Sequence, residues 1–343
     1  MNLKEKLRKL RIAFGKLVLD RKISFTKLRL PPKKILFLRQ DGKIGDYIVS
    51  SFVFREIKKQ LPNIEIGVIC SDKNAYLFNK NAYIDHCYIV RTRNILDYLK
   101  CGMKLANQKY DLVIDPTIAL RNRDLLLLRV INAKHYIGYE KTNYQLFDFN
   151  IKNEKKHIST VYKRALELIG LNHIDISYDI PLNKDSHERI KIYLSESCLD
   201  SFIALNLFGA SSTRSFNDNK IYELLEYLKK NTNKPILLLT FPAIARKLKK
   251  IACHFSEVFI YEHTKTVFDT IELIRFADLV ISPDTSIVHI AVGLNKKLIA
   301  FYSLDEQNFI HWQPNNLVET HILRFEHNIN EINISEIQAK WLN

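Results

Sequence analysis

The sequence lacks the features that would place it among metal-binding, disulfide-stabilised or membrane-spanning proteins. Its five cysteines are scattered over 343 residues with no Cys-x-x-Cys pair, which is typical of reduced thiols in a cytoplasmic protein, and it shows no zinc-ligand spacing. No apolar run approaches the roughly 18 residues of a spanning helix. No apolar stretch near the N-terminus is long enough for a signal-peptide core. We therefore expect a cytoplasmic protein.

Two common nucleotide-binding motifs are also missing. The glycines of the segment 40–46, QDGKIGD, fit neither the Gly-x-Gly-x-x-Gly motif of dinucleotide-binding proteins nor the P-loop, which requires Gly-Lys followed by Ser or Thr. Dinucleotide-binding proteins of that type and P-loop proteins are therefore disfavoured. The sequence also shows no close internal repeat and no low-complexity segment.

The positive charge is concentrated at the N-terminus. Residues 1–34 hold twelve Lys or Arg against two acidic residues, so they supply +10 of the net +15. Leu3, Leu7, Leu10, Phe14 and Leu17 recur at helical spacing among these cations. A basic amphipathic helix of this kind can lie on an anionic membrane surface, and we expect residues 1–30 to contact one. The alternative is a helix that docks on the protein's own core with its charges in solvent.

The rest of the chain alternates between apolar strands and helices, which predicts an α/β protein with parallel sheets. A length of 343 residues favours two domains. We expect a basic segment at 1–33, a first domain at 34–185, a second at 186–325 and a C-terminal helix at 326–343 that packs back on the first domain. The polar stretch 171–200 is interpreted as the linker. The expected strands are 35–38, 64–70, 85–90, 112–115 and 135–137 in the first domain, and 203–207, 235–240, 258–261, 279–281 and 297–302 in the second. The expected helices are 47–61, 93–108, 119–132, 155–170, 217–231, 242–254, 266–276 and 286–294.

The first candidate site follows the first strand. Asp41, Gly42, Lys43 and Gly45 form a loop in which glycine allows a tight turn, and Asp46 stands where the next helix starts. A carboxylate at that edge of a sheet can act as a general base toward a hydroxyl group. The alternative interpretation is that Asp46 is only a helix N-cap.

The second candidate site follows the first strand of the second domain. Small and hydroxyl-bearing residues, Ser211 and Ser212 among them, can present donors to phosphate oxygens. Arg214 adds a permanent positive charge suited to a diphosphate. The alternative is a polar surface turn.

The third candidate site, SPDTSIVH over 282–289, also joins a strand to a helix. Thr285 and Ser286 would expose donors at the positive end of that helix. Asp284 can accept hydrogen bonds from sugar hydroxyls, and His289 lies about one turn further along. The alternative is an Asp cap with His289 buried in the core.

The order of these segments resembles that of the lipopolysaccharide heptosyltransferases, glycosyltransferase family 9. The segments that carry the resemblance are Ile44-Gly45-Asp46 after an apolar strand, Leu61-Pro62 before the next strand, HYIGY at 135–139, Gly209 to Ser212, and SPDTSIVHIAVGLNKKLIAFYS at 282–303. The resemblance covers about Lys34 to Ser303.

The resemblance implies a GT-B fold, in which two Rossmann-like domains face each other across a cleft. It implies an inverting, metal-independent glycosyltransferase without a cofactor, moving heptose from ADP-heptose to a lipid-linked oligosaccharide acceptor of the lipopolysaccharide core. It further implies Asp46 as the catalytic base, phosphate contacts from Ser211, Ser212, Arg214 and Thr285, and a donor-sugar contact from Asp284. We expect the protein at the inner face of the cytoplasmic membrane, peripherally bound.

Other functions stay open at this stage. Ser286 replaces a glycine of the family motif, so a different nucleotide-sugar donor is one alternative. A basic nucleic-acid-binding protein is another, although the chain shows no RRM, KH, zinc-finger or clear helix-turn-helix signature and we expect no nucleic-acid partner. A family member that binds without catalysing transfer is a third.

Overall fold

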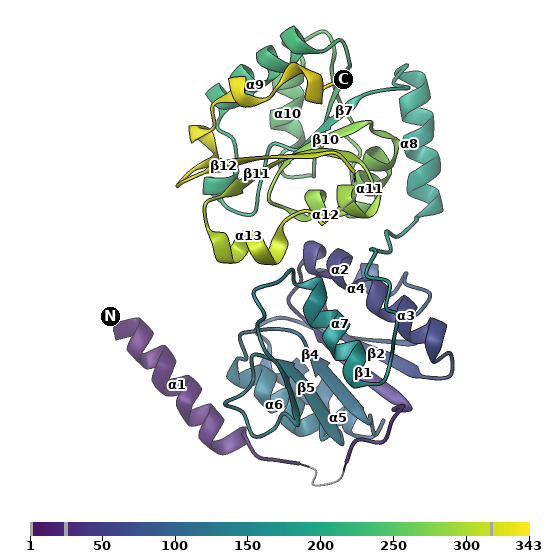
Figure 1. The fold of residues 1–343 in the computed structure, drawn as a ribbon, viewed down its shortest axis with the longest axis vertical. Coiled ribbons are helices and arrows are strands. Elements are labelled where there is room, and N and C mark those ends of the chain that lie inside the picture. The colour runs from purple at the N-terminus through teal and green to yellow at the C-terminus, as the bar shows by residue number, and fades with distance from the viewer. Residues whose placement is uncertain (1–2, 24–26, 316–317) are drawn as a thin grey trace. The chain divides into compact units, whose positions relative to one another are not determined.

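The computed structural model describes residues 3–23, 27–315 and 318–343. The chain divides into two compact units, 1–177 and 178–343. Each contains one six-stranded sheet (Figure 1), as expected of an α/β protein. Within the described residues, no helix is both long and apolar enough to cross a membrane.

The sheet of the first unit is entirely parallel, and its strand order reverses once. Its order is β3-β2-β1-β4-β5-β6. The strands are β1 (Lys34–Arg39), β2 (Glu65–Ser71), β3 (His86–Val90), β4 (Leu112–Asp115), β5 (His135–Tyr139) and β6 (Phe149–Ile151). Strand β1 pairs with β2 on one side and β4 on the other. Ligands of open α/β sheets bind at the carboxyl ends of strands that flank such a reversal.

The helices of the first unit are α1 (Leu3–Leu19), α2 (Ile44–Ser50), α3 (Phe52–Gln60), α4 (Ala75–Phe78), α5 (Ile95–Ala106), α6 (Asn122–Ile131) and α7 (Ser159–Leu168). The single helix expected over 47–61 is divided at Ser51. The Ser50 hydroxyl donates to the Asp46 carbonyl at 2.7 Å, and the Ser51 hydroxyl donates to the Ile48 carbonyl at 2.7 Å. Serine hydroxyls that bond back to the preceding turn bend helices.

The second unit repeats the same topology. Its sheet order is β12-β11-β10-β7-β8-β9, again parallel, with the reversal between β7 and β10. The strands are β7 (Ile203–Leu205), β8 (Ile236–Leu238), β9 (Val258–Ile260), β10 (Leu279–Pro283), β11 (Lys297–Ser303) and β12 (Thr320–Phe325). The helices are α8 (Lys184–Glu196), α9 (Asp218–Asn231), α10 (Ala245–Ala252), α11 (Val267–Phe276), α12 (Ser286–Gly293) and α13 (Glu306–Trp312).

Four parts of this unit differ from the sequence-based expectation. Helix α8 occupies much of the polar stretch interpreted as a linker; it buries few apolar residues and is fixed to α11 by an ion pair between Arg189 and Asp269 at 2.8 Å. Strand β12 and helix α13 were not expected. Three short 3₁₀ turns replace the expected C-terminal helix, because Asn328 and Asn333 cap separate turns. Their isoleucines pack in the core of the second unit.

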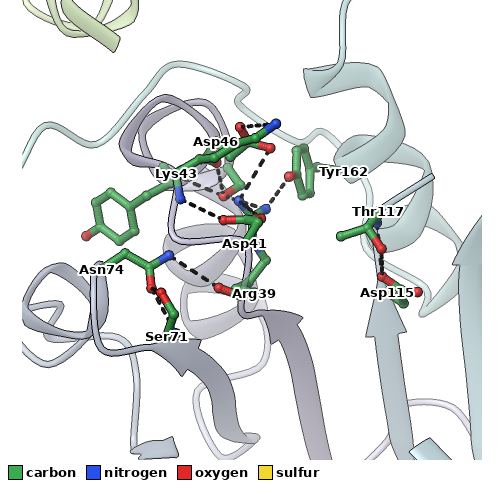
Figure 2. Close-up of polar contacts among 11 residues, drawn as sticks. Arg39, Asp41, Lys43, Asp46, Ser71, Asn74, Asp115, Thr117 and Tyr162 are labelled. Carbon is green, nitrogen blue, oxygen red and sulfur yellow. Dashed lines mark hydrogen bonds and ion pairs between the residues drawn. The ribbon is translucent and has the colours of Figure 1, made fainter. Parts of the chain in front are cut away.

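One buried polar contact ties the carboxyl end of β1 to α7. Arg39, the last residue of β1, is 1% exposed. Its Nη1 donates to the hydroxyl of Tyr162 on α7 (Figure 2). It also donates, at 3.2 Å, to the hydroxyl of Ser50 on α2. A buried guanidinium needs such acceptors, because removing a charge from water is costly. The contact therefore fixes both helices against the end of the strand.

Replacing Tyr162 with Phe tests the contribution of this contact. The Tyr162→Phe variant keeps the ring beside Arg39 and removes one acceptor from a buried cation. We expect the free energy of unfolding to fall by about 1–3 kcal/mol, measured by urea denaturation.

Tyr139→Phe is the matched control, since Tyr139 is equally buried and its hydroxyl has no hydrogen-bond partner in the described chain. We expect little change or a slight stabilisation there. Equal losses in the two variants would contradict the role given to the Arg39–Tyr162 hydrogen bond.

Candidate functional site

The three candidate segments all lie at strand ends that flank the two reversals of strand order. Asp41 to Asp46 follow β1, Gly209 to Arg214 follow β7, and Asp284 to His289 follow β10. The structure therefore gathers the first segment at one edge of the first sheet. It brings the other two together at the corresponding edge of the second sheet.

The loop after β1 is a tight turn held by its own side chains. Gly42 has a φ of 73°, a conformation that favours glycine, and a Cβ there would lie 3.0 Å from the Ser71 hydroxyl. The Asp41 carboxylate accepts from the Lys43 backbone N–H at 3.0 Å. Gly45, expected in this loop, is instead the second residue of α2. The turn is thereby fixed directly beside Asp46.

Asp46 is not the cap of its helix. The N-cap position of α2 is Lys43, and Asp46 lies in the first turn, so the N-cap interpretation is wrong. The Asp46 side chain is 20% exposed, 4.0 Å from Nη2 of Arg39 and 3.8 Å from Nζ of Lys43 (Figure 2). A partly open carboxylate between two cations is thus presented at the sheet edge.

Burial raises the pKa of Asp46 above its ordinary value. The positive charges of Arg39 and Lys43 oppose the rise, and the negative charge of Asp41 adds to it. A carboxylate with a raised pKa is a stronger proton acceptor than an ordinary aspartate. The surroundings of Asp46 therefore suit a group that takes a proton from a substrate hydroxyl.

The loop after β7 is open and rich in hydroxyl groups. Ser211 and Ser212 are exposed, and the Ser211 and Thr213 hydroxyls lie 2.8 Å apart. Ser215 shapes the loop, since its hydroxyl accepts from the Gly209 N–H at 3.1 Å and donates to the Ser211 carbonyl at 2.8 Å. The serine hydroxyls remain accessible, as a phosphate-binding loop requires.

Arg214 at the end of this loop meets Asp284 after β10. Its Nη1 lies 2.9 Å from Oδ2 of Asp284, which also accepts from the Asn308 amide at 3.0 Å. Burial raises the pKa of Asp284, while the hydrogen bonds from Asn308 and Arg214 oppose the rise. The Arg214 side chain is 34% exposed and the Asp284 side chain 9%. Arg214 therefore keeps part of its guanidinium available to an anion.

A polar network supports the start of α12. The Thr285 hydroxyl accepts from the Ile287 N–H at 3.2 Å and is the N-cap, so the cap is not Asp284. The Asn206 amide donates to Ser282 and Thr285 at 3.0 and 3.2 Å. Ser286, half-buried, is the first residue of the helix. The helix N-terminus thus lies beside Arg214 and Asp284.

His289 points into the interior of the second unit. It is 4% exposed, and its ring centroid lies 5.7 Å from that of Trp312 on α13. The sequence predicted a donor-sugar contact for His289, and the structure places its side chain among buried residues of α12 and beside α13.

Sequence reasoning missed four residues that shape these sites, namely Arg39, Tyr162, Asn206 and Asn308. A charged or amide residue at the end of an apolar strand, as in ILFLR and IALN, was an available signal for the first and third. No comparable signal marks Tyr162 or Asn308. Among the described residues, no group of three or more His, Cys, Asp or Glu side chains could hold a metal ion.

Comparison with known proteins finds relatives among the lipopolysaccharide heptosyltransferases. The chain is 25% identical over 303 residues to the putative lipopolysaccharide heptosyltransferase 4 of Escherichia coli K12, a match that covers 82% of this chain and 79% of that protein. Among solved structures, it is similar to a glycosyltransferase of family 9 from Veillonella parvula, with a TM-score of 0.75 at 14% identity over 94% of this chain and 98% of the other.

It is also similar to the Escherichia coli ADP-heptose lipopolysaccharide heptosyltransferase II, with a TM-score of 0.70 at 15% identity, over 90% of this chain and 97% of the other. The fold is thereby confirmed as the GT-B type, with two Rossmann-like domains. The sequence model of glycosyltransferase family 9 (heptosyltransferase) matches residues 98–340. With most of its length matched, the chain belongs to this family and is a glycosyltransferase.

Proposed function

We propose that this protein transfers heptose from ADP-heptose to an oligosaccharide acceptor of the lipopolysaccharide core, with inversion at the anomeric carbon. The observation that carries the proposal is Asp46, a partly open carboxylate at a strand-order reversal with a pKa raised by burial. The substrate class is supported by relatives whose names include lipopolysaccharide heptosyltransferase 4 and a heptosyltransferase structure with ADP.

The second unit would bind the donor. Ser211, Ser212, Thr285 and Ser286 would supply hydroxyl and backbone donors to the diphosphate, and the exposed part of Arg214 would offset its charge. Asp284, already fixed by Asn308, would accept hydrogen bonds from sugar hydroxyls. His289 is buried, so we assign it an indirect role in supporting the start of α12 beneath the sugar.

The first unit would bind the acceptor through Asp41, Gly42, Lys43 and Gly45 and supply the base. In one displacement, the acceptor oxygen bonds to the anomeric carbon while its proton passes to Asp46. The bond from that carbon to the diphosphate breaks, and ADP leaves with the electron pair. Arg214 and the N-terminus of α12 would stabilise the charge that develops on the leaving group. No step in this sequence requires a metal or a cofactor.

A lipid-linked acceptor also suggests where the reaction takes place. We propose that the protein works in the cytoplasm, bound peripherally to the inner face of the cytoplasmic membrane. The basic excess of residues 1–34 supports this placement, because the surface of that leaflet is negative.

Asp46→Asn tests the proposed base. The amide keeps the shape of the carboxylate but cannot accept the proton, so we expect turnover with the natural acceptor to fall about 10²–10⁴-fold while ADP binding is unchanged. The matched control is Asp185→Asn, an exposed carboxylate in the first turn of α8, which should keep full turnover. Near-full activity in Asp46→Asn would remove Asp46 from the mechanism.

The pH dependence of kcat/KM tests the surroundings of Asp46. The base must be ionised, so the raised pKa of Asp46 places the acidic limb of the profile above that of an ordinary aspartate. Lys43→Gln removes a charge that lowers this pKa and should move the limb to higher pH. Asp41→Asn removes a charge that raises it and should move the limb to lower pH. Shifts in the opposite directions would contradict the assignment.

Thermal stabilisation by nucleotide sugars tests the donor. ADP-heptose at 100 times its Kd should stabilise the protein by about 2.7 kcal/mol, while UDP-, GDP- and CMP-sugars at the same concentration should have little effect. Arg214→Gln should weaken ADP binding about tenfold, the equivalent of one charge-assisted hydrogen bond. Lys230→Gln, exposed in the last turn of α9, is the control. A larger stabilisation by UDP-sugars than by ADP-sugars would contradict ADP-heptose as the donor and would identify a UDP-sugar instead.

A further inference from the structure

Helix α1 carries a row of large apolar side chains that face solvent. Leu7, Leu10, Phe14, Leu17 and Val18 are 58%, 67%, 69%, 77% and 48% exposed. At 3.6 residues per turn, these five positions fall within a stripe about 100° wide on the helix surface. We call them the apolar stripe of α1. Single exposed apolar residues are ordinary, but a contiguous group marks an interaction surface.

The opposite side of α1 attaches the helix to the first unit. Gly15 is buried against α6, where an added Cβ would lie 2.3 Å from the Asn122 side chain. The Asn122 amide donates to the Arg11 carbonyl at 2.6 Å, and the Lys16 ammonium lies 4.6 Å from the ring centroid of Tyr144. Leu19 packs against the core. These contacts hold α1 in place and leave its apolar stripe directed outward.

The attachment continues beyond the end of α1. The carboxylate of Asp20, which is 8% exposed, accepts from the Leu146 N–H at 2.9 Å. The side chain of Ile23 packs against the same core as Leu19. The segment is therefore anchored at its C-terminal end as well as along α6.

Positive charge borders the apolar stripe. Lys6 and Arg11 are exposed and lie about 20° beyond the two edges of the stripe on the helix. Residues 1–34 as a whole carry +10. Long cationic side chains at the edges of an apolar face reach lipid phosphates while the face itself enters the acyl region.

We infer that α1 lies in the plane of an anionic membrane surface, with its apolar stripe inserted between the lipids and Lys6 and Arg11 on their phosphates. The inference rests on the membrane location given under the proposed function and names the surface of the protein that contacts the lipids. A second copy of the chain is a poorer occupant of the stripe, because two copies of α1 would bring like charges together. Nucleic acid would use the charge but would leave the apolar stripe in water.

Sedimentation with lipid vesicles tests this inference on the full chain. The protein should bind vesicles that contain phosphatidylglycerol and bind pure phosphatidylcholine vesicles at least tenfold more weakly, and added salt should reduce the difference. Leu10→Ser/Phe14→Ser and Lys6→Gln/Arg11→Gln should each weaken binding to the anionic vesicles about tenfold or more.

Matched controls separate the apolar stripe from apolarity and charge in general. Leu96→Ser/Ile192→Ser removes side chains that are 62% and 56% exposed on α5 and α8, and Lys100→Gln/Lys191→Gln removes two exposed cations. Both should bind like the wild type. Equal binding to the two lipid compositions, or equal losses in stripe and control variants, would overturn the inference.

Further measurements distinguish a membrane from other partners of the apolar stripe and separate this inference from the proposed reaction. A dimer in light scattering that Leu10→Ser/Phe14→Ser dissociates, or retardation of duplex DNA by protein that does not sediment with vesicles, would assign α1 to a different partner. Transfer to a water-soluble, deacylated acceptor should be unchanged in the stripe variants, and Asp46→Asn should bind vesicles normally. A result against the proposed reaction would therefore leave the membrane inference intact. A result against membrane binding would likewise leave the proposed reaction intact.

Discussion

A buried cation at the end of β1 organises the part of the first unit that holds Asp46, the proposed base. The guanidinium of Arg39 is withdrawn from water at the point where the parallel strands of the first sheet end, and its desolvation must be offset by nearby acceptors and carboxylates. Ser50 and Tyr162 accept from it, and Asp41 and Asp46 lie 3.5 and 4.0 Å away. The same group that fixes the loop and α2 also opposes the rise in the pKa of Asp46 that burial causes. Arg39 therefore affects both the position of this carboxylate and its proton affinity, which burial raises.

The two units share a topology but treat charge in opposite ways. In the first, the cation is buried beneath an accessible carboxylate; in the second, Asp284 is buried and Arg214 keeps a third of its side chain exposed. The second sheet ends in an uncharged network of Asn206, Ser282 and Thr285. This difference suits the proposed division of labour, since a unit that accepts a proton needs an open carboxylate and a unit that binds a diphosphate needs an open cation.

The sequence predicted what depends on local pattern. The apolar run Ile35 to Leu38 and the junction segments around Asp46 and Thr285 are local features. In the structure the run forms β1, and the two junction segments follow the ends of β1 and β10. Helix α8 was missed because its burial rests on few apolar side chains and on ion pairs with α11. Arg39 and Tyr162 are 123 residues apart in the sequence, and no local pattern around either residue predicts its contact with the other.

The residues proposed to work at the membrane are energetically separate from those that hold the fold. The apolar stripe of α1 is solvent-exposed in the isolated protein, so its side chains contribute little to the burial that stabilises the first unit. The attachment of α1 rests instead on Gly15, Asn122, Asp20 and Leu19. Substitutions in the stripe can therefore change lipid affinity without unfolding the unit, whereas a substitution at Gly15 would displace the helix itself. Because folding leaves the apolar stripe in contact with water, insertion of the stripe between lipids removes that apolar surface from water. The free energy of this burial therefore contributes to membrane binding and not to folding.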